Sequence, residues 1–150
     1  MKEQEGGNIW TAHHNGFWIA IGTNGFIKKD GTNVMGAGVA LQAKDRFPGI
    51  SKRVGEAIKV YGNHVYPITE LHIVTFPTKH NWFQKADLTL IARSAVELNA
   101  IPAEMFGNRT VYIPRVGCGN GGLDWAHVQP ILSKLLDDRF TVVHFGPEKK

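Results

Sequence analysis

Two glycine-rich segments constrain the fold of this chain more than any other feature of its sequence. The longer one, residues 117–122, lies between an apolar run over residues 111–113 and a helix-like run that starts near Asp124. The shorter one, residues 36–38, also leads from a loop into a helix-like run. Loops of this kind bring backbone N–H groups close to a bound phosphate. Two of them on one small domain indicate a ligand with two phosphate groups.

The size and composition of the chain indicate one globular domain. Its 150 residues, of which 43% are hydrophobic and 20% charged, suffice for a proper core, so we expect a single domain over residues 1–150. No apolar run reaches membrane-spanning length and the first residues are polar, so we expect neither a signal peptide nor membrane contact. The single cysteine, Cys118, excludes an internal disulfide and favours a reducing, cytoplasmic location. The formal net charge of +4 would attract a pyrophosphate without indicating nucleic-acid binding by itself.

Alternation of strand-like and helix-like runs predicts an α/β fold. Strands are expected over residues 9–12, 17–22, 64–67, 70–76, 109–114 and 139–145. Apolar residues at helical spacing predict helices near residues 39–47, 50–61, 88–98 and 124–135. Pro130 predicts a kink or a late start in the last of these helices.

Four segments are expected to meet in one cleft, because ligands of open α/β sheets bind at the carboxyl ends of the strands. Asn24, residues 36–38, residues 76–82 and residues 117–122 all lie just beyond such strand ends. Neither glycine segment matches Gly-x-Gly-x-x-Gly before an acidic residue, nor Gly-x-x-x-x-Gly-Lys-Ser/Thr. A dinucleotide dehydrogenase and an ATPase of those types are therefore set aside.

Segments 7–9, 19–24, 35–40 and 114–123 resemble the successive motifs of the macrodomains, which are ADP-ribose-binding α/β modules. The resemblance covers about residues 7–146, with short polar termini outside it, and its last motif is the most specific. It implies a three-layer sandwich, in which a mixed central sheet of about six strands has helices on both faces. The histidines show no metal-ligand spacing and there is no paired acidic cluster, so we expect no metal site, and we expect no cofactor. The ligand-binding residues that the resemblance implies are Asn8, Ile9, Met35, Gly36, Ala37, Gly38, Val39, Thr78, Val116, Gly117, Cys118, Gly119, Asn120, Gly121, Gly122, Leu123 and Phe145.

Segments 34–42, 76–82 and 119–125 are similar to the macrodomain branch that hydrolyses ADP-ribose from modified macromolecules through a lysine. This branch includes antitoxin macrodomains that remove ADP-ribose from thymidine in DNA, and a related enzyme that acts on glutamate-linked ADP-ribose. By this resemblance Lys79 matches the catalytic lysine, and Asn24 matches an asparagine beside the distal ribose. Gly121 stands where the glutamate-directed enzyme has an aspartate, which favours a nucleic-acid-linked substrate. Asn8 replaces an aspartate that contacts the adenine amine; its amide oxygen can still accept a hydrogen bond, without the charge.

Several of these residues also have simpler interpretations. Lys79 can be solvated surface, but bulky apolar neighbours can desolvate its amine and expose a lone pair that attacks, or stabilises charge at, the anomeric carbon. Asn24 can be a turn asparagine before a glycine. Trp82 can stack on a base or pack in the core, and core packing is also the simpler interpretation of Phe145. For Cys118, packing beneath a phosphate loop is preferred to a role as nucleophile.

Three functions remain open on the sequence alone. The first is hydrolysis of the ADP-ribosyl link to a macromolecule, most simply to thymidine in DNA. The second is a non-catalytic reader of ADP-ribose, or a sponge for a nucleotide derived from it. The third is removal of phosphate from ADP-ribose 1″-phosphate, for which His80 is the one candidate acid–base near the cleft. The expected partners are ADP-ribose or ADP-ribosylated nucleic acid, with any ADP-ribosyltransferase toxin on a separate chain, and the protein is expected to be a monomer.

Overall fold

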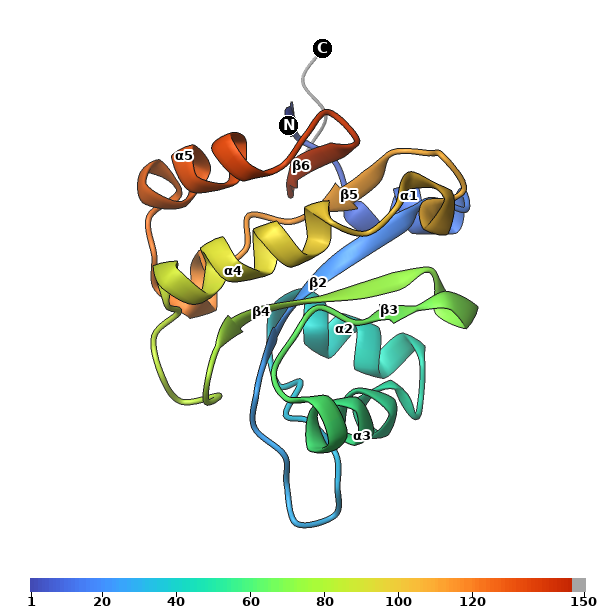
Figure 1. Cartoon of the computed structure of the whole chain (residues 1–150), viewed down its shortest axis with the longest axis vertical. Coiled ribbons are helices and arrows are strands. Elements are labelled where there is room, and N and C mark those ends of the chain that lie inside the picture. Colours follow the sequence, from blue (N-terminus) through green and yellow to red (C-terminus); the bar gives the residue numbers. More distant parts are fainter. Residues whose placement is uncertain (147–150) are drawn as a thin grey trace.

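A six-stranded mixed sheet forms the centre of the computed structural model, which describes residues 1–146 (Figure 1). The strand order is β1-β6-β5-β2-β4-β3, and only the β3–β4 pair is antiparallel. The strands are β1 (Lys2–Glu5), β2 (Trp18–Asn24), β3 (Pro67–Ile68), β4 (Ile73–Lys79), β5 (Val111–Ile113) and β6 (Phe140–His144).

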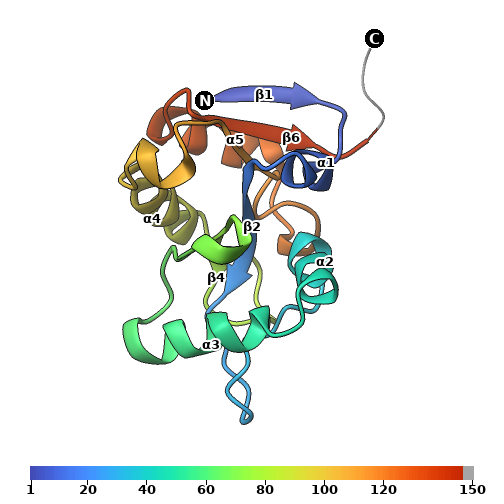
Figure 2. The ribbon, with the colours of Figure 1, turned by 90° about the vertical axis from the view of Figure 1, so that its right-hand side faces the viewer.

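Helices cover both faces of this sheet. Helices α4 (Leu88–Asn99) and α5 (Trp125–Leu135) pack on one face. The other face carries α1 (Ile9–His14), α2 (Gly38–Arg46) and α3 (Ile50–Tyr61), and the two helical layers are separated by the strands in Figure 2. Short 3₁₀ turns are η1 (Thr69–Leu71), η2 (Ala103–Phe106) and η3 (Gly119–Gly121). The predicted three-layer α/β sandwich is therefore confirmed.

Strand β2 explains how the two cores are divided. Its side chains alternate between the faces, as in any strand, so Trp18 and Ala20 join the core under α4 and α5. Ile19 and Ile21 join the core under the other helices. Both faces of β2 are covered by helices, so its residues are apolar on both sides. This continuous apolar run is the pattern from which the strand was predicted. Its register sets Ile19 opposite Ile73 of β4 and Trp18 opposite Val111 of β5.

The strand expected over residues 9–12 is wrong, because these residues begin α1. The side chain of Asn8 caps this helix: its Oδ1 accepts a hydrogen bond from the backbone N–H of Trp10 at 2.9 Å. Asparagine is a preferred N-capping residue, so Asn8 is a sequence signal for the start of a helix. Ile9 and Trp10 are buried against the sheet.

Strand β1 was not predicted, because its sequence Lys-Glu-Gln-Glu is polar and has no apolar alternation. The segment is exposed and lies at the edge of the sheet, parallel to β6 in the register Lys2↔Thr141. Charged side chains are typical of edge strands, because they discourage pairing with other chains. The other expected polar terminus, beyond residue 146, lies outside the described residues.

Two smaller expectations are also corrected. The late start predicted for the last helix is wrong, because α5 begins at Trp125, with Asp124 as its N-cap, and includes Pro130. The strand expected over residues 64–67 is reduced to β3, which starts only at Pro67, and the next strand starts at Ile73 because η1 precedes it. By contrast, α3 begins and ends where the apolar spacing and Gly62 predict.

Candidate functional site

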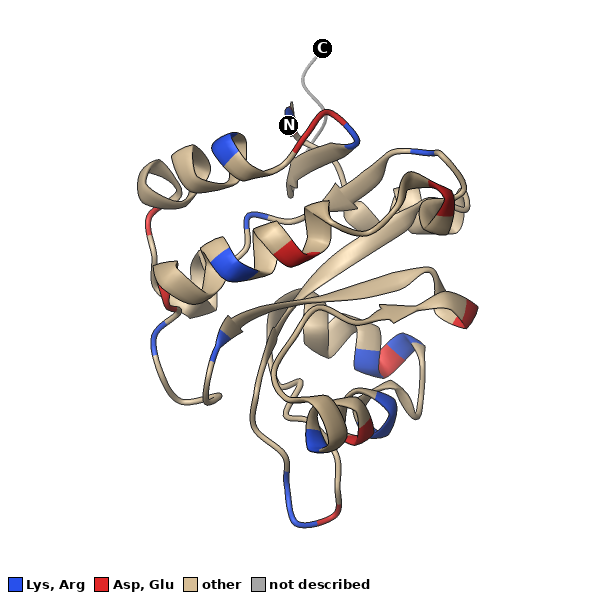
Figure 3. Cartoon of the chain, in the orientation of Figure 1, with Lys and Arg blue, Asp and Glu red and all other residues tan. Residues whose placement is uncertain are grey.

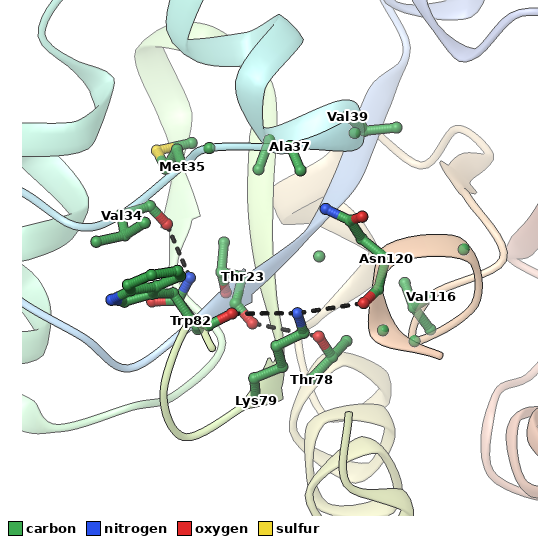
Figure 4. Close-up of a pocket in the computed structure, with 18 of the residues that line it drawn as sticks. Thr23, Val34, Met35, Ala37, Val39, Thr78, Lys79, Trp82, Val116 and Asn120 are labelled. Carbon is green, nitrogen blue, oxygen red and sulfur yellow. Dashed lines mark hydrogen bonds between the residues drawn. The ribbon is translucent and has the colours of Figure 1, made fainter. Parts of the chain in front are cut away.

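A cavity of about 730 Å³ opens at the carboxyl ends of β2, β4 and β5. The four segments that were expected to converge all contribute to its wall, and Figure 4 shows residues of each around one central space. The hairpin-like segment after β2 adds Phe26, Lys28 and Val34, which were not among the predicted site residues. This volume is typical of cavities that enclose a small organic ligand.

The amino end of α2 forms one wall of the cavity. The first hydrogen bond of the helix runs from the N–H of Leu41 to the carbonyl of Ala37 at 3.1 Å, so the amides of Gly38, Val39 and Ala40 lie before the ladder begins. No side chain caps this helix. Unpaired amides at a helix N-terminus, together with the helix dipole, favour an anion.

The glycine segment after β5 forms the opposite wall, and its glycines are required by its backbone. Gly117, Gly119 and Gly122 have φ angles of +77°, +69° and +76°, which side chains of L-residues rarely adopt. Gly117 also has no room for a side chain, because a Cβ there would lie 2.6 Å from Cδ1 of Ile91. The N–H of Ala86 donates to the carbonyl of Gly121 at 2.9 Å and fixes the segment against the start of α4.

The charges along the wall favour an anionic ligand. Lys28, Lys79 and Arg115 line the cavity, and no carboxylate is found among its described lining residues. Two contacts hold the guanidinium of Arg115 in place. Its Nη2 lies 3.5 Å from Oε1 of Glu5, and its Cζ lies 5.1 Å from the ring centroid of Trp125. A cavity lined by basic side chains and by no acidic ones attracts ligands that carry phosphate groups.

Lys79 is the last residue of β4, and its amine points into the cavity (Figure 4). Its Nζ lies 3.4 Å from the carbonyl oxygen of Trp82 and 3.5 Å from that of Asn120. The amine is therefore held between the loop that follows β4 and the glycine segment that follows β5. This placement gives Lys79 access to any ligand that contacts both glycine segments.

Asn24, at the end of β2, lines the cavity, but its side chain also shapes the segment that follows. Its Nδ2 donates to the carbonyl of Val34 at 2.8 Å, and its Oδ1 accepts from the N–H of Phe26 at 3.0 Å. Asn33 adds a further bond from its Nδ2 to the same Oδ1 at 3.2 Å. These contacts support the interpretation as a turn asparagine. A role in orienting a ribose stays a prediction.

Cys118 lines the cavity and also packs against the core beneath the glycine segment. Its Sγ lies 3.7 Å from the carbonyl oxygen of Val116. Burial raises the pKa of the Cys118 thiol, and nearby Arg115 only opposes this in part. The thiol is therefore protonated near neutral pH, which disfavours its use as a nucleophile.

The resemblance to the lysine-dependent branch implies turnover of an ADP-ribosylated substrate, and we expect Cys118→Ser to change that turnover by less than about threefold, as is usual for substitutions without a special mechanism. Serine preserves the size of the side chain beneath the loop. Initial rates and calorimetric titration of ADP-ribose check this. A variant that binds ADP-ribose normally but has lost all turnover would show that the thiol is the nucleophile.

Trp82 and His80 lie on the loop between β4 and α4. Trp82 lines the cavity with 51% of its surface exposed, so its interpretation as a core residue is wrong. His80 lies outside the lining, and its Nε2 lies 3.1 Å from Oδ2 of Asp87, the N-cap of α4. The hydrogen bond from His80 lowers the pKa of the Asp87 carboxyl. His80 therefore ties the loop to α4 rather than facing the cavity.

Five of the predicted ligand-binding residues lie outside the cavity lining: Asn8, Ile9, Gly122, Leu123 and Phe145. Asn8 is exposed and caps α1, while Leu123 packs against the core. Phe145 follows β6 and is 77% exposed, which contradicts core packing as its explanation. The ligand-binding roles of these five residues stay predictions.

Two further observations concern the described residues as a whole. Within residues 1–146, no group of three or more His, Cys, Asp or Glu side chains is placed to hold a metal ion. Over the same residues, none of the helices has both the length and the apolar character needed to cross a membrane.

The sequence is similar to part of longer, curated proteins. No protein-family model matches the chain. The DNA ADP-ribosyl glycohydrolase of Mycobacterium tuberculosis is 34% identical to it over 105 residues, which are 64% of this chain and 30% of the relative. The chain thus spans about a third of the length of the curated relatives it matches.

The fold is similar to solved macrodomains over nearly its whole length. The macrodomain of Mycobacterium tuberculosis DarG superposes with a TM-score of 0.77 at 26% identity, covering 97% of this chain and 98% of that one. Thermosipho africanus DarTG in complex with ADP-ribose superposes with a TM-score of 0.76 at 20% identity, covering 100% of this chain and 43% of that one. Together with the cavity between two glycine segments, these similarities show that the chain belongs to the macrodomain family, on the branch of the DarG macrodomains.

Proposed function

We propose that the protein binds ADP-ribose in this cavity and hydrolyses the bond that joins ADP-ribose to a base of DNA. The position of Lys79 carries the proposal, because its amine faces the cavity beside the glycine segment after β5, which is one of the two walls that can hold a diphosphate. The similar protein of Mycobacterium tuberculosis is named a DNA ADP-ribosyl glycohydrolase, and the Thermosipho africanus neighbour was solved with ADP-ribose. Since the match covers only 30% of that relative, the activity is a proposal for this chain.

The geometry assigns a task to each wall. The amides of Gly38, Val39 and Ala40, with the backbone of the glycine segment opposite, are placed to bind the diphosphate. The distal ribose then lies toward Lys79. Its neutral amine attacks the anomeric carbon, the bond to the base breaks, and the base leaves with the electron pair. The proton released by the alkylated amine goes to the base, and water then frees ADP-ribose and restores the lysine.

Gly121 supports a base rather than a glutamate side chain as the modified group. It is buried, and a Cβ at this position would lie 3.0 Å from Cβ of Ala86, which leaves little room for an aspartate. The resemblance to the lysine-dependent branch places a catalytic aspartate there in the glutamate-directed enzyme. Among the described residues that line the cavity, no carboxylate is present to take that role.

We also propose a setting for this activity. The protein acts in the cytoplasm as a monomer, and the ADP-ribosyltransferase toxin that it counteracts is a separate chain. The contact of His80 with Asp87, outside the cavity lining, disfavours the phosphatase alternative.

A panel of substrates tests the proposal. ADP-ribose is first titrated by calorimetry, and the protein is then incubated with ADP-ribosylated DNA, ADP-ribosylated protein and ADP-ribose 1″-phosphate. The proposal expects binding of ADP-ribose and its release from DNA. Binding without turnover of any substrate would identify a reader or sponge, and release of inorganic phosphate alone would identify a phosphatase.

A further inference from the structure

Trp82 and Phe83 form an exposed aromatic pair at the mouth of the cavity. They are 51% and 66% exposed, and their rings meet edge to face with centroids 5.6 Å apart. Trp82 lines the cavity, whereas Phe83 lies outside its lining. Large aromatic side chains beside a ligand cavity mark an interaction surface when they are left exposed.

Basic side chains lie on the same loop as this pair and on a second segment that lines the cavity. Lys28 and Lys29 are exposed on the protruding hairpin after β2, and Lys28 also lines the cavity. Lys85, on the same loop as the aromatic pair, lies against Gly122 of the glycine segment. In Figure 3, basic residues are blue on the protruding hairpin and on the loop between β4 and α4. The carboxylate of the hairpin, Asp30, accepts hydrogen bonds from the N–H and Oγ1 of Thr32 at 3.0 and 2.6 Å.

We propose that Trp82, Phe83, Lys28, Lys29 and Lys85, here called the aromatic platform, bind the single-stranded DNA that carries the ADP-ribosylated base. The inference rests on the proposed function, because ADP-ribose in the cavity places the modified base at the mouth, beside Trp82. A neighbouring base then stacks on the exposed ring of Phe83, and the lysines pair with phosphates of the strand.

The stacking requirement selects the form of the substrate. Bases within a duplex are stacked on each other and present only their edges, whereas bases of a single strand present faces that aromatic rings can cover. The platform therefore favours a modified single strand over the same base in a duplex. It also favours an oligonucleotide over an isolated nucleoside, because only the oligonucleotide has a neighbouring base and phosphates.

Phe83→Ala tests the platform. The substrates are a ten-nucleotide single strand with one ADP-ribosylated thymidine, the same strand in a duplex, and ADP-ribosylated thymidine alone. We expect the wild type to prefer the single strand, and we expect Phe83→Ala to raise KM for that strand about tenfold, the loss typical of one base–aromatic contact. Turnover of the nucleoside and the affinity for ADP-ribose should not change. Phe83→Trp should restore the low KM.

Met105→Ala is the matched control, since Met105 is 41% exposed and lies in η2, which precedes β5 at the opposite end of the strand from the cavity. It should leave all three substrates unaffected. Equal KM values for Phe83→Ala and the wild type on the single strand would overturn the platform. So would a loss of equal size on the nucleoside, or a wild type that prefers the duplex.

A binding measurement separates failure of the platform from failure of the proposed function. If the wild type turns over none of the substrates, the proposed function fails, but fluorescence anisotropy of a labelled, unmodified ten-nucleotide strand still tests the surface. The platform predicts salt-sensitive binding that Phe83→Ala weakens and Met105→Ala does not. Identical binding by Phe83→Ala and the wild type would overturn the platform on its own.

Discussion

Lys79→Ala is expected to lower turnover of ADP-ribosylated single-stranded DNA by about a thousandfold or more, the range for loss of a group that acts directly on the reacting atoms. The amine that faces the cavity is lost, and no other basic side chain of the lining lies between the same two carbonyls. Affinity for ADP-ribose should stay within about fivefold, since a partly solvated charge contributes under about 1 kcal/mol. Single-turnover rates and calorimetry measure the two quantities separately.

Lys79→Arg is the control that separates amine chemistry from charge. Arginine keeps the positive charge but cannot release a proton near neutral pH, so it cannot supply a neutral nucleophile. We expect it to bind ADP-ribose and to stay inactive. Full turnover by Lys79→Ala would remove the lysine from the mechanism, and substantial turnover by Lys79→Arg would leave it only an electrostatic role.

Gly55→Ala is expected to destabilise the protein by about 3 kcal/mol, although alanine is the better helix former. Gly55 is buried in α3, where the segment after β2 crosses the helix. A Cβ there would lie 2.0 Å from the carbonyl oxygen of Gly31 and 3.1 Å from the backbone nitrogen of Asn33. Because these are backbone atoms, the segment must move. The melting temperature should fall by about 10 °C.

The same displacement is expected to weaken ADP-ribose binding, because Asn33 ties the segment to the cavity wall. Its N–H donates to the carbonyl of Ser51 at 2.9 Å, and its Nδ2 donates to the carbonyl of Asn24 at 2.9 Å. Ala57→Gly, the reverse change in the same helix, should cost about 1 kcal/mol and leave the affinity unchanged. A Gly55→Ala protein that melts at or above the wild-type temperature would contradict this account.

Much of the fold could be predicted because the signals are local. Helix α3 has a regular apolar stripe and ends at Gly62, so its bounds follow from the sequence. Strand β2 is apolar throughout because both of its faces are covered. Strand β1 could not be predicted in this way, since its polar residues become a strand only by pairing with β6, at the far end of the chain. The start of α1 was missed even though Asn8 marks it.

For the site, too, the residues placed by local signals could be predicted, and those placed by long-range packing could not. The positions of residues 36–38, Lys79 and residues 117–121 follow from strand ends that precede them, so their convergence could be predicted. Phe26 and Val34 were missed because their place in the wall depends on the crossing at Gly55, which the spacing of residues does not reveal. The exposure of Trp82 likewise depends on the path of its loop, so the sequence left stacking and core packing open.

A crystal structure of the protein with ADP-ribose tests the central claim most directly. The account predicts the diphosphate between the amides of residues 38–40 and the backbone of residues 117–121, with the anomeric carbon of the distal ribose facing Nζ of Lys79. A diphosphate bound away from these two segments, or a distal ribose turned away from that amine, would contradict it.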